Sequence, residues 1–431
     1  MKKENINRRK FIEKMGFIAG SSVLAGTVPW IDFLKADQPT KVSPSDKVRV
    51  GIIGIGNRGR VLLLHLKAIP SVDIVAVCDD YEPNYQRARR LTDYKAKGFY
   101  NYKTMLDEMK DMDAVVIATP LYWHARMVID AFEAGKHVFC EKAMAKNAED
   151  CYNMVRAQQK HGKVFLIGHQ RVFNHIFLEA LEKIKSGKLG QITQIRAYWH
   201  RNNDWRRYVP HPSLERKINW RLYRDYSLGL ITELGSHHFQ VANWIMNDYP
   251  IEACGSGSIN YWKDGREVYD NINLVYKYRN GNHFIYDSMT SNKKYGYEVQ
   301  AMGDKGTMEI ETNRYYTENP PEPPAVKKLI NDVENDIFNA IPIGGASWIP
   351  ETAQQYDGEL ILNKRSSEIP QDTHLQMEGF VEMVRENTFV PELIREGYYA
   401  SMNAVMADTA MREKRVVKFP DQYKISYEYQ S

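Results

Sequence analysis

Three glycines in the order Gly54-x-Gly56-x-x-Gly59 constrain this 431-residue chain more than any other feature. They follow a compact apolar run, Val48–Ile53, and precede a stretch of helix-forming residues, Val61–Lys67. In a strand–turn–helix unit the first glycine permits the tight turn, the second lets a pyrophosphate approach the backbone, and the third lets helix and strand touch. The sequence therefore predicts a dinucleotide site at the N-terminus of this helix. The residues expected to line it are Gly54, Gly56, Asn57, Arg58 and Gly59.

An acidic residue completes the pattern. A second apolar run, Val72–Cys78, is followed at once by Asp79, which lies 20 residues beyond Gly59. A carboxylate at this position accepts hydrogen bonds from the adenosine ribose. The 2′-phosphate of NADP would be repelled by this carboxylate. At a separation of ~4 Å the repulsion costs roughly 1 kcal/mol in water and about 4 kcal/mol at an effective dielectric of 20, so Asp79 favours NAD. Arg58 and Arg60 are close enough in sequence to offset a 2′-phosphate, so NADP stays open as the less favoured cofactor.

Short apolar runs alternate with helical stretches up to residue 170. Three more runs follow the first two, at Asp113–Ala118, His137–Cys140 and Lys163–Ile167. Strands that alternate with helices in this way predict a doubly wound parallel sheet with right-handed crossovers, an α/β Rossmann domain over residues 46–170.

The pattern changes after residue 170, where alternating runs are longer. They lie at Ile192–Arg201, Glu252–Trp262, Ile272–Tyr278, His283–Ser288, Glu298–Ala301 and Thr307–Ile310. Turn sequences at 279–282 and 303–306 predict two hairpins. We therefore expect an α+β domain over 171–431, with an open, mainly antiparallel sheet covered on one face. Within it we expect an insertion at about 312–368, with one helix at Val326–Ala340, and C-terminal helices at 370–414.

The first 35 residues are predicted to be a leader and not part of the fold. Residues 1–14 contain six Lys or Arg and two Glu, so their net charge of +4 equals that of the whole chain. The remainder is neutral overall, which gives no support for a nucleic-acid-binding surface. Arg8-Arg9 precedes Met15–Ile31, an uncharged run that is only moderately apolar, and this resembles a twin-arginine export signal. The alternative is a disordered basic tail beside an amphipathic helix.

That signal predicts export to the periplasm, with the leader either removed or kept as an anchor. No other segment approaches 18 consecutive apolar residues, so no stable membrane span is expected in the mature protein. Because free nicotinamide cofactor is not expected outside the cytosol, an exported enzyme should keep its cofactor bound through turnover.

Polar residues follow the carboxyl ends of the later strands, where open parallel sheets bind their ligands. Glu141 and Lys142 come directly after the fourth strand. Lys142 beside a nicotinamide could hold a substrate hydroxyl and lower its pKa, although a surface Lys–Glu pair would look the same in sequence. Further residues expected at this edge, beside the cofactor, are Thr119, Pro120, Trp123, His124 and Gln170.

Glu233 and His237 are four residues apart, so on a helix they share a face. A neutral histidine suits proton abstraction near pH 7. His238 projects about 100° around from His237 and cannot serve the same point. A purely structural Glu–His pair is the alternative.

These three stretches together resemble the glucose–fructose oxidoreductase, inositol dehydrogenase and rhizopine-catabolism (Gfo/Idh/MocA) family of oxidoreductases over about residues 47–310. The resemblance implies that Lys142, Glu233 and His237 contact the reacting hydroxyl, with His237 as the base. Ala143 stands where the family motif has proline, and Glu233 where it has aspartate. The longer carboxylate side chain predicts a different substrate fit.

Aromatic and polar residues in Trp199–Tyr208 and Asn219–Tyr226 are interpreted as a carbohydrate-facing wall, because aromatic faces stack on sugars while Arg and Asn bind hydroxyls. Ordinary aromatic residues of a sheet would give a similar count. The predicted substrate-binding residues are Lys142, Arg171, Trp205, Arg206, Tyr223, Glu233 and His237. The four cysteines have no zinc-binding spacing, and no metal is expected.

Three functions fit the sequence. The first is an NAD(P)-dependent oxidoreductase acting on a sugar, glycoside or polyol, with tightly bound cofactor. The second is an NAD-dependent glycoside hydrolase or lyase that oxidises a ring hydroxyl transiently. The third is a non-catalytic dinucleotide- or sugar-binding protein. A homo-oligomer, dimer or tetramer, is expected in each case.

Overall fold

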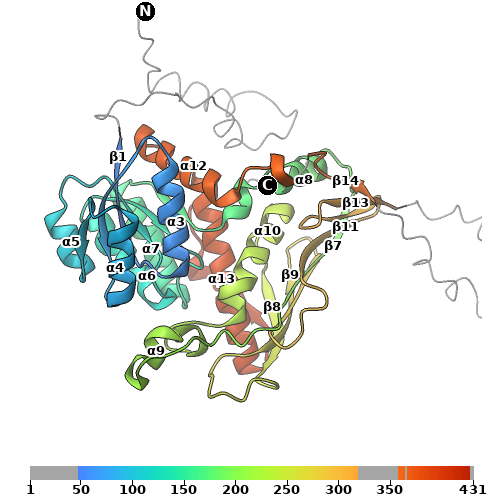
Figure 1. The fold of residues 1–431 in the computed structure, drawn as a ribbon. Coiled ribbons are helices and arrows are strands. Elements are labelled where there is room, and N and C mark those ends of the chain that lie inside the picture. Colours follow the sequence, from blue (N-terminus) through green and yellow to red (C-terminus); the bar gives the residue numbers. More distant parts are fainter. Residues whose placement is uncertain (1–46, 319–357, 365, 428–431) are drawn as a thin grey trace, which may run out of the picture.

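The computed structural model describes residues 47–318, 358–364 and 366–427, which form two domains that lie side by side (Figure 1). The predicted leader, residues 1–35, lies outside the described residues, as does the helix predicted at Val326–Ala340.

The N-terminal domain is built on a six-stranded sheet whose strands are all parallel. Their order is β3-β2-β1-β4-β5-β6, the doubly wound arrangement that the alternating pattern predicted. The strands are β1 (Val48–Ile53), β2 (Val72–Cys78), β3 (Lys97–Phe99), β4 (Ala114–Ile117), β5 (His137–Cys140) and β6 (Phe165–Ile167).

Helices cover both faces of this sheet (Figure 1). They are α3 (Asn57–Ala68), α4 (Glu82–Leu91), α5 (Tyr102–Glu108), α6 (His124–Glu133) and α7 (Ala148–His161). Because both faces are covered, the central strands are apolar throughout and do not alternate, and every residue of β4 is buried. β3, α4 and α5 were not predicted, because the three-residue strand and the largely polar helix α4 give weak patterns.

The second domain is a mixed, mostly antiparallel sheet in the order β14-β13-β12-β11-β7-β10-β9-β8-β15. Its strands are β7 (Ile192–His200), β8 (Glu252–Ser258), β9 (Asn271–Lys277), β10 (His283–Met289), β11 (Tyr297–Gly303), β12 (Gly306–Glu309), β13 (Arg314–Thr317), β14 (Glu359–Leu360) and β15 (Val417–Lys418). The hairpins predicted at 279–282 and 303–306 join β9 to β10 and β11 to β12. Within the sheet β7 and β10 are parallel.

Alternating burial shows that this sheet has one covered face. In β9, Ile272, Leu274 and Tyr276 are buried, while the residues between them are exposed. The covered face packs against α10 (Ser236–Met246) and α13 (Pro391–Glu413).

The C-terminal helices join the two domains. α13 is largely buried and contacts α7 and β6 of the first domain as well as α10 and β8 of the second (Figure 1). α12 (Asp372–Glu386) packs against α3, the helix that follows the glycine turn. This packing holds the carboxyl edge of the parallel sheet opposite α10 and fixes the two walls of the cleft between the domains.

Across the described ranges, no helix combines the length and the apolar composition needed to cross a bilayer.

Candidate active site between the two domains

The glycine turn has the shape that a dinucleotide requires. Gly54 has a φ of +86°, and a Cβ there would lie 2.8 Å from the backbone of Ala118. A Cβ at Gly59 would lie 1.9 Å from the carbonyl oxygen of Gly54, so helix and turn touch directly. Around Gly56 no heavy atom lies within 4 Å of a Cβ position, which leaves open space at the N-terminus of α3. This turn therefore fits a pyrophosphate approaching the backbone.

Asp79 stands at the end of β2, beside the turn, and its carboxylate is buried. One oxygen accepts a hydrogen bond from the Ile55 amide at 2.6 Å and the other accepts one from the Tyr81 amide at 2.9 Å. Burial raises the pKa of Asp79, and these hydrogen bonds oppose the increase. A carboxylate offers about four acceptor sites, so capacity remains for a ribose hydroxyl.

Arg58 reaches from the start of α3 across to the loop after β5. Its Nε donates to Glu141 Oε1 at 2.7 Å, and Nη1 donates to Thr373 Oγ1 at 3.2 Å. Its Nη2 is buried without a hydrogen-bond partner. A guanidinium held by two groups and with a third nitrogen still able to donate fits an anionic cofactor.

His124 supports the cofactor edge structurally. It lies at the start of α6, and its two ring nitrogens face the carbonyl oxygens of Ala143, at 2.9 Å, and Thr119, at 3.0 Å. Burial lowers its pKa, so the ring is neutral and only one nitrogen donates at a time. His124 thus joins the loops that follow β4 and β5.

The other residues predicted at this edge lie on the same side of the sheet. Pro120 precedes a short 3₁₀ turn, Leu121–Trp123, and the indole of Trp123 is exposed. Gln170 begins another 3₁₀ turn after β6, and its Oε1 is buried without a hydrogen-bond partner.

Lys142 follows β5 and points at the second domain. Its Nζ donates to the carbonyl oxygens of Thr232 at 3.1 Å and Glu233 at 2.7 Å. Burial lowers the pKa of Lys142, while the carboxylates of Glu233 and Glu141 raise it. The peptide bond between Lys142 and Ala143 is cis. The ammonium therefore lies at the contact between the two domains.

Glu233 belongs to a π-helical turn, Ile231–Gly235, that runs directly into α10. Its Oε2 accepts from Arg221 Nε at 2.7 Å, and its Oε1 accepts from Ser227 Oγ at 3.0 Å. Burial alone would raise the pKa of Glu233, but the positive charges of Arg221 and Lys142 outweigh it and lower the pKa. Glu233 is thus held as a carboxylate.

His237 lies one turn further, on α10, and is buried. Its ring centroid is 5.7 Å from that of His169 and 5.9 Å from that of Trp199. Burial, and then the charges of Lys142 and Arg171, lower the pKa of His237 well below its ordinary value of 6.5. The ring is therefore neutral, and among the described residues its Nδ1 has no hydrogen-bond partner.

His238 faces another group. Its Nε2 lies 3.7 Å from Glu311 Oε1, the same oxygen that accepts from Arg171 Nε at 2.8 Å. Arg171 also lies over the ring of Trp199, 5.3 Å from its centroid. The arginine predicted to bind substrate is therefore partly neutralised by Glu311 and positions the indole beside His237.

Two of the predicted substrate residues belong to a polar network of the 201–229 segment. Arg206 pairs with Glu215 at 2.5 Å and with Asp264 at 3.2 Å, and the Tyr223 hydroxyl donates to Glu215 at 2.7 Å. Trp205, with a φ of +62°, lies in the same segment and packs against the core. The structure thus brings Lys142, Glu233, His237 and Arg171 together and gives Arg206 and Tyr223 internal partners.

Sequence reasoning missed several residues of this site. Arg221 and Ser227 hold Glu233, His169 contacts His237, and Glu311 holds Arg171. His169 follows β6 at the ligand-binding edge, which was a usable signal. Glu311 had none, because it lies 140 residues from its partner.

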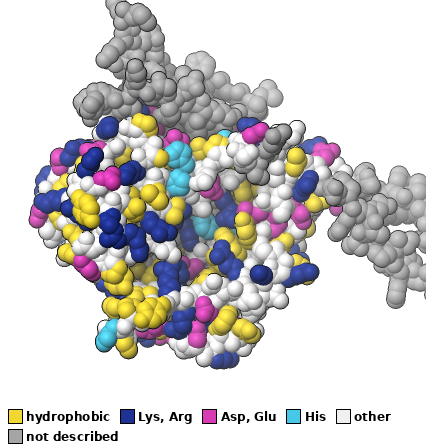
Figure 2. All heavy atoms as spheres, in the orientation of Figure 1, with side chains coloured by type: hydrophobic (Ala, Val, Ile, Leu, Met, Phe, Trp, Pro, Cys, Tyr) yellow, Lys and Arg dark blue, Asp and Glu magenta, His cyan; other side chains and the backbone are white. Residues whose placement is uncertain are grey.

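The cleft itself is visible on the surface. Figure 2 shows a hollow between the domains, with Lys and Arg side chains (dark blue) around it and histidine (cyan) inside. In the described part of the chain, no three His, Cys, Asp or Glu residues are grouped as metal ligands.

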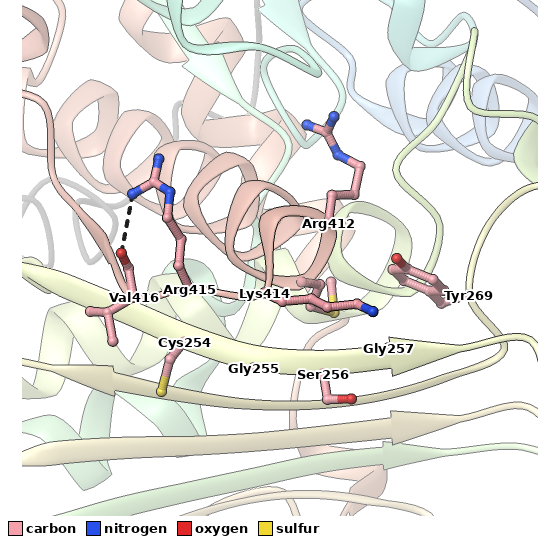
Figure 3. Close-up of a pocket in the computed structure, with 10 residues that line it drawn as sticks. Cys254, Gly255, Ser256, Gly257, Tyr269, Arg412, Lys414, Arg415 and Val416 are labelled. Carbon is pink, nitrogen blue, oxygen red and sulfur yellow. Dashed lines mark hydrogen bonds between the residues drawn. The ribbon is translucent and has the colours of Figure 1, made fainter.

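A separate cavity of about 490 Å³ lies between the end of α13 and β8 (Figure 3). Two of its three basic side chains are paired, Arg412 with Asp408 and Arg415 with Glu413, each at 2.6 Å. Lys414 is the third. Glycines and Cys254 form its floor on β8, so it has no catalytic grouping comparable to that of the cleft.

Comparison with known proteins identifies both domains. The pattern of the Gfo/Idh/MocA oxidoreductase family, NAD-binding Rossmann fold, matches residues 48–169, and that of the Gfo/Idh/MocA C-terminal domain matches residues 177–309. The chain belongs to the Gfo/Idh/MocA family. That family is one of oxidoreductases with an NAD-binding Rossmann fold, as the sequence resemblance implied.

Curated relatives fall into two groups. Inositol 2-dehydrogenase of Salmonella typhimurium is 27% identical over 281 residues, 62% of this chain and 74% of that protein. Glycosyl hydrolase family 109 protein 1 of a Shewanella species is 26% identical over 258 residues, 53% of this chain. The match spans 55% of the length of that relative.

Solved structures share the fold at low identity. Levoglucosan dehydrogenase in complex with NADH and levoglucosan aligns with 87% of this Gfo/Idh/MocA chain and 100% of its own, with a TM-score of 0.65 and 17% identity. Aldose-aldose oxidoreductase of Caulobacter crescentus gives a TM-score of 0.65 at 20% identity, covering 86% of this chain and 100% of its own. Structural relatives thus include proteins with bound NAD(H).

Proposed function

We propose that this enzyme oxidises a hydroxyl group of a sugar, glycoside or polyol, using a tightly bound NAD. The observation that carries the proposal is the position of Lys142 and His237: a buried ammonium and a neutral imidazole lie together where the carboxyl edge of the NAD-binding sheet meets the second domain.

Each residue has a separate task. Lys142 donates to the substrate oxygen and stabilises the negative charge that develops as its proton leaves. His237 accepts that proton, because its ring is neutral at pH 7. NAD held by the glycine turn and Asp79 would supply a hydride acceptor for the carbon that bears this hydroxyl. Glu233, held by Arg221 and Ser227, binds a neighbouring hydroxyl and orients the ring.

NAD is the proposed cofactor over NADP. The support is Asp79, whose carboxylate would repel a 2′-phosphate. Arg58, which could have offset that charge, instead donates to Glu141 and Thr373.

A second candidate is glycoside cleavage through transient oxidation. It is favoured by similarity to proteins named glycosyl hydrolase family 109 and, in Shewanella oneidensis, α-N-acetylgalactosaminidase, which is 26% identical over 258 residues. In this reaction oxidation of a ring hydroxyl acidifies the adjacent C–H. A base removes that proton as the protonated aglycone leaves, water adds across the resulting double bond, and the hydride first taken up by the cofactor would return to the carbonyl.

One experiment tests both candidates. Purified protein is incubated with a panel of free sugars, polyols and aryl glycosides, and products are identified by mass spectrometry. Net oxidation gives a product lighter by two hydrogens, whereas transient oxidation releases the aglycone with no oxidised sugar left over. If neither product forms and bound cofactor absorbance never changes, the oxidoreductase proposal is wrong.

We also propose export by the twin-arginine route to the periplasm, and assembly as a homo-oligomer. Support for export is the Arg8-Arg9 pair before an uncharged run. Replacing both arginines with lysine should leave folded, cofactor-loaded precursor in the cytoplasm, as measured by cell fractionation. Unchanged export would contradict the route, and size-exclusion chromatography with light scattering tests the oligomer.

A further inference from the structure

The charge balance of the cleft points beyond a neutral sugar. Three cation–carboxylate pairs line it, and each is internally balanced: Arg58–Glu141, Arg171–Glu311 and Arg221–Glu233. Lys142 is buried and donates only to backbone carbonyl oxygens. No carboxylate in the described ranges forms an ion pair with Arg201 or Arg207. Among the described residues three cationic side chains, Lys142, Arg201 and Arg207, thus have no paired carboxylate on the substrate side of the cleft.

Arg201 lies on the wall formed by Trp199. It follows β7 directly, and its guanidinium is over the Trp199 ring, 5.1 Å from the centroid. The same indole lies near His237, whose ring centroid is 5.9 Å from that of the indole. An exposed arginine stacked on an aromatic ring keeps its planar fork oriented and its donors free.

Arg207 lies on the other wall, near the carboxylate that binds substrate. Its backbone is bonded to Asn219, two residues before Arg221, and Arg221 is the partner of Glu233. The Arg207 amide donates to Asn219 Oδ1 at 2.7 Å, and its carbonyl accepts from Asn219 Nδ2 at 3.2 Å. Its side chain is exposed. Within the part of the chain that the structure describes, no acceptor is hydrogen-bonded to the Arg207 side chain.

We propose that Arg201 and Arg207 form an anion-binding subsite of the cleft and that the substrate is an acidic carbohydrate, one carrying a carboxylate, sulfate or phosphate group. This inference rests on the proposed oxidation of a sugar hydroxyl. Unpaired guanidinium groups beside a buried ammonium repel one another, and an anionic substituent offsets that repulsion while accepting two parallel hydrogen bonds from an arginine. A neutral sugar offers these arginines no charged acceptor, and their exposed guanidinium groups then stay hydrated.

The test uses the full chain with its bound cofactor and matched sugar pairs: glucuronate with glucose, galacturonate with galactose, and a sugar with its sulfate and phosphate esters. Initial rates of cofactor reduction give kcat/KM, and calorimetry gives the dissociation constant independently of turnover. The acidic member should be preferred by about 10- to 100-fold. The preferred ester or acid then identifies which anionic group the subsite takes.

Two variants and a control locate the effect. Arg207→Gln and Arg201→Gln should each lower kcat/KM for the acidic sugar about 10-fold more than for its neutral partner. Lys414→Gln, an exposed cation of the cavity in Figure 3, should leave the preference unchanged. Circular dichroism and retained cofactor check folding.

The outcomes separate the two proposals. If neutral sugars are oxidised as efficiently as acidic ones, or if neither arginine variant changes the preference, the acidic substrate is wrong while oxidation stands. If no sugar reduces the cofactor yet acidic sugars bind and Arg207→Gln abolishes binding, the subsite stands and the oxidation proposal fails. Absence of binding by every acidic sugar overturns the subsite.

Discussion

Replacing His237 with alanine tests the proposed chemistry most sharply among single substitutions. The neutral imidazole accepts the hydroxyl proton, and general-base assistance of this kind contributes ~10²–10⁴-fold to a rate. At 1.36 kcal/mol per factor of ten this is about 2.7–5.4 kcal/mol of transition-state stabilisation. Lys142→Met removes a charge-assisted hydrogen bond worth about 1.5–3 kcal/mol, roughly 10- to 150-fold. We therefore expect kcat to fall further for His237→Ala than for Lys142→Met.

The assay is single-turnover reduction of the bound cofactor, with cofactor content measured after denaturation. Both variants should retain cofactor, because neither side chain contacts the glycine turn. His238→Ala is the matched control, since His238 faces Glu311, and its effect on kcat should be mild once folding is confirmed. Wild-type turnover in His237→Ala, or an inactive but folded His238→Ala, would show that the base is misassigned.

Three other predictions follow from the site. Glu233→Gln should mainly raise KM, by about 10-fold, because Arg221 loses its ion pair and a substrate hydroxyl loses a charged acceptor. An unchanged KM in steady-state kinetics would contradict this. Asp79→Ala should shift the ratio of NAD to NADP affinity by roughly 1–4 kcal/mol towards NADP, measured by titrating cofactor-stripped protein, and an unchanged ratio would remove Asp79 from cofactor selection. The free energy of unfolding should fall as pH drops below 6.5. Burial lowers the pKa of His169 to about 3 and that of His238 to about 4, so in this range the unfolded state binds protons that the folded state does not. Each histidine then costs about 1.36 kcal/mol of stability per pH unit, until its folded-state pKa is reached. Denaturant titrations at pH 7 and 5 check this, and equal free energies of unfolding would refute it.

The parallel sheet was predictable because its strands are buried on both faces. β1, β2 and β5 have the bounds of their apolar runs, Val48–Ile53, Val72–Cys78 and His137–Cys140. Short edge elements escaped prediction. β15 and β14 have two residues each, too few to produce any alternation, and they form only through pairing with β8 and β13.

The site was predictable where it depends on position along a strand or helix. Lys142 directly follows a buried strand. Glu233 and His237 are four residues apart, and both lie in the site even though Glu233 belongs to a π-helical turn. Partners set by tertiary packing were not predictable. Glu311 acquires its role only when segments 140 residues apart meet, and Arg221, although 12 residues from Glu233, meets it only through the fold of the intervening loop. Arg206, predicted to bind substrate, also pairs with Glu215 and Asp264.

The central claim is that Lys142 and His237 transfer the hydroxyl proton while the bound cofactor is reduced. Its most direct test is to mix the purified protein in stoichiometric amount with an oxidisable carbohydrate and record reduced-nicotinamide absorbance together with the product mass. Reduced cofactor should accumulate in proportion to protein, together with a ketone or lactone product, and His237→Ala should slow both equally. Cofactor that stays oxidised with every carbohydrate tested, or an aglycone released without any oxidised sugar, would contradict it.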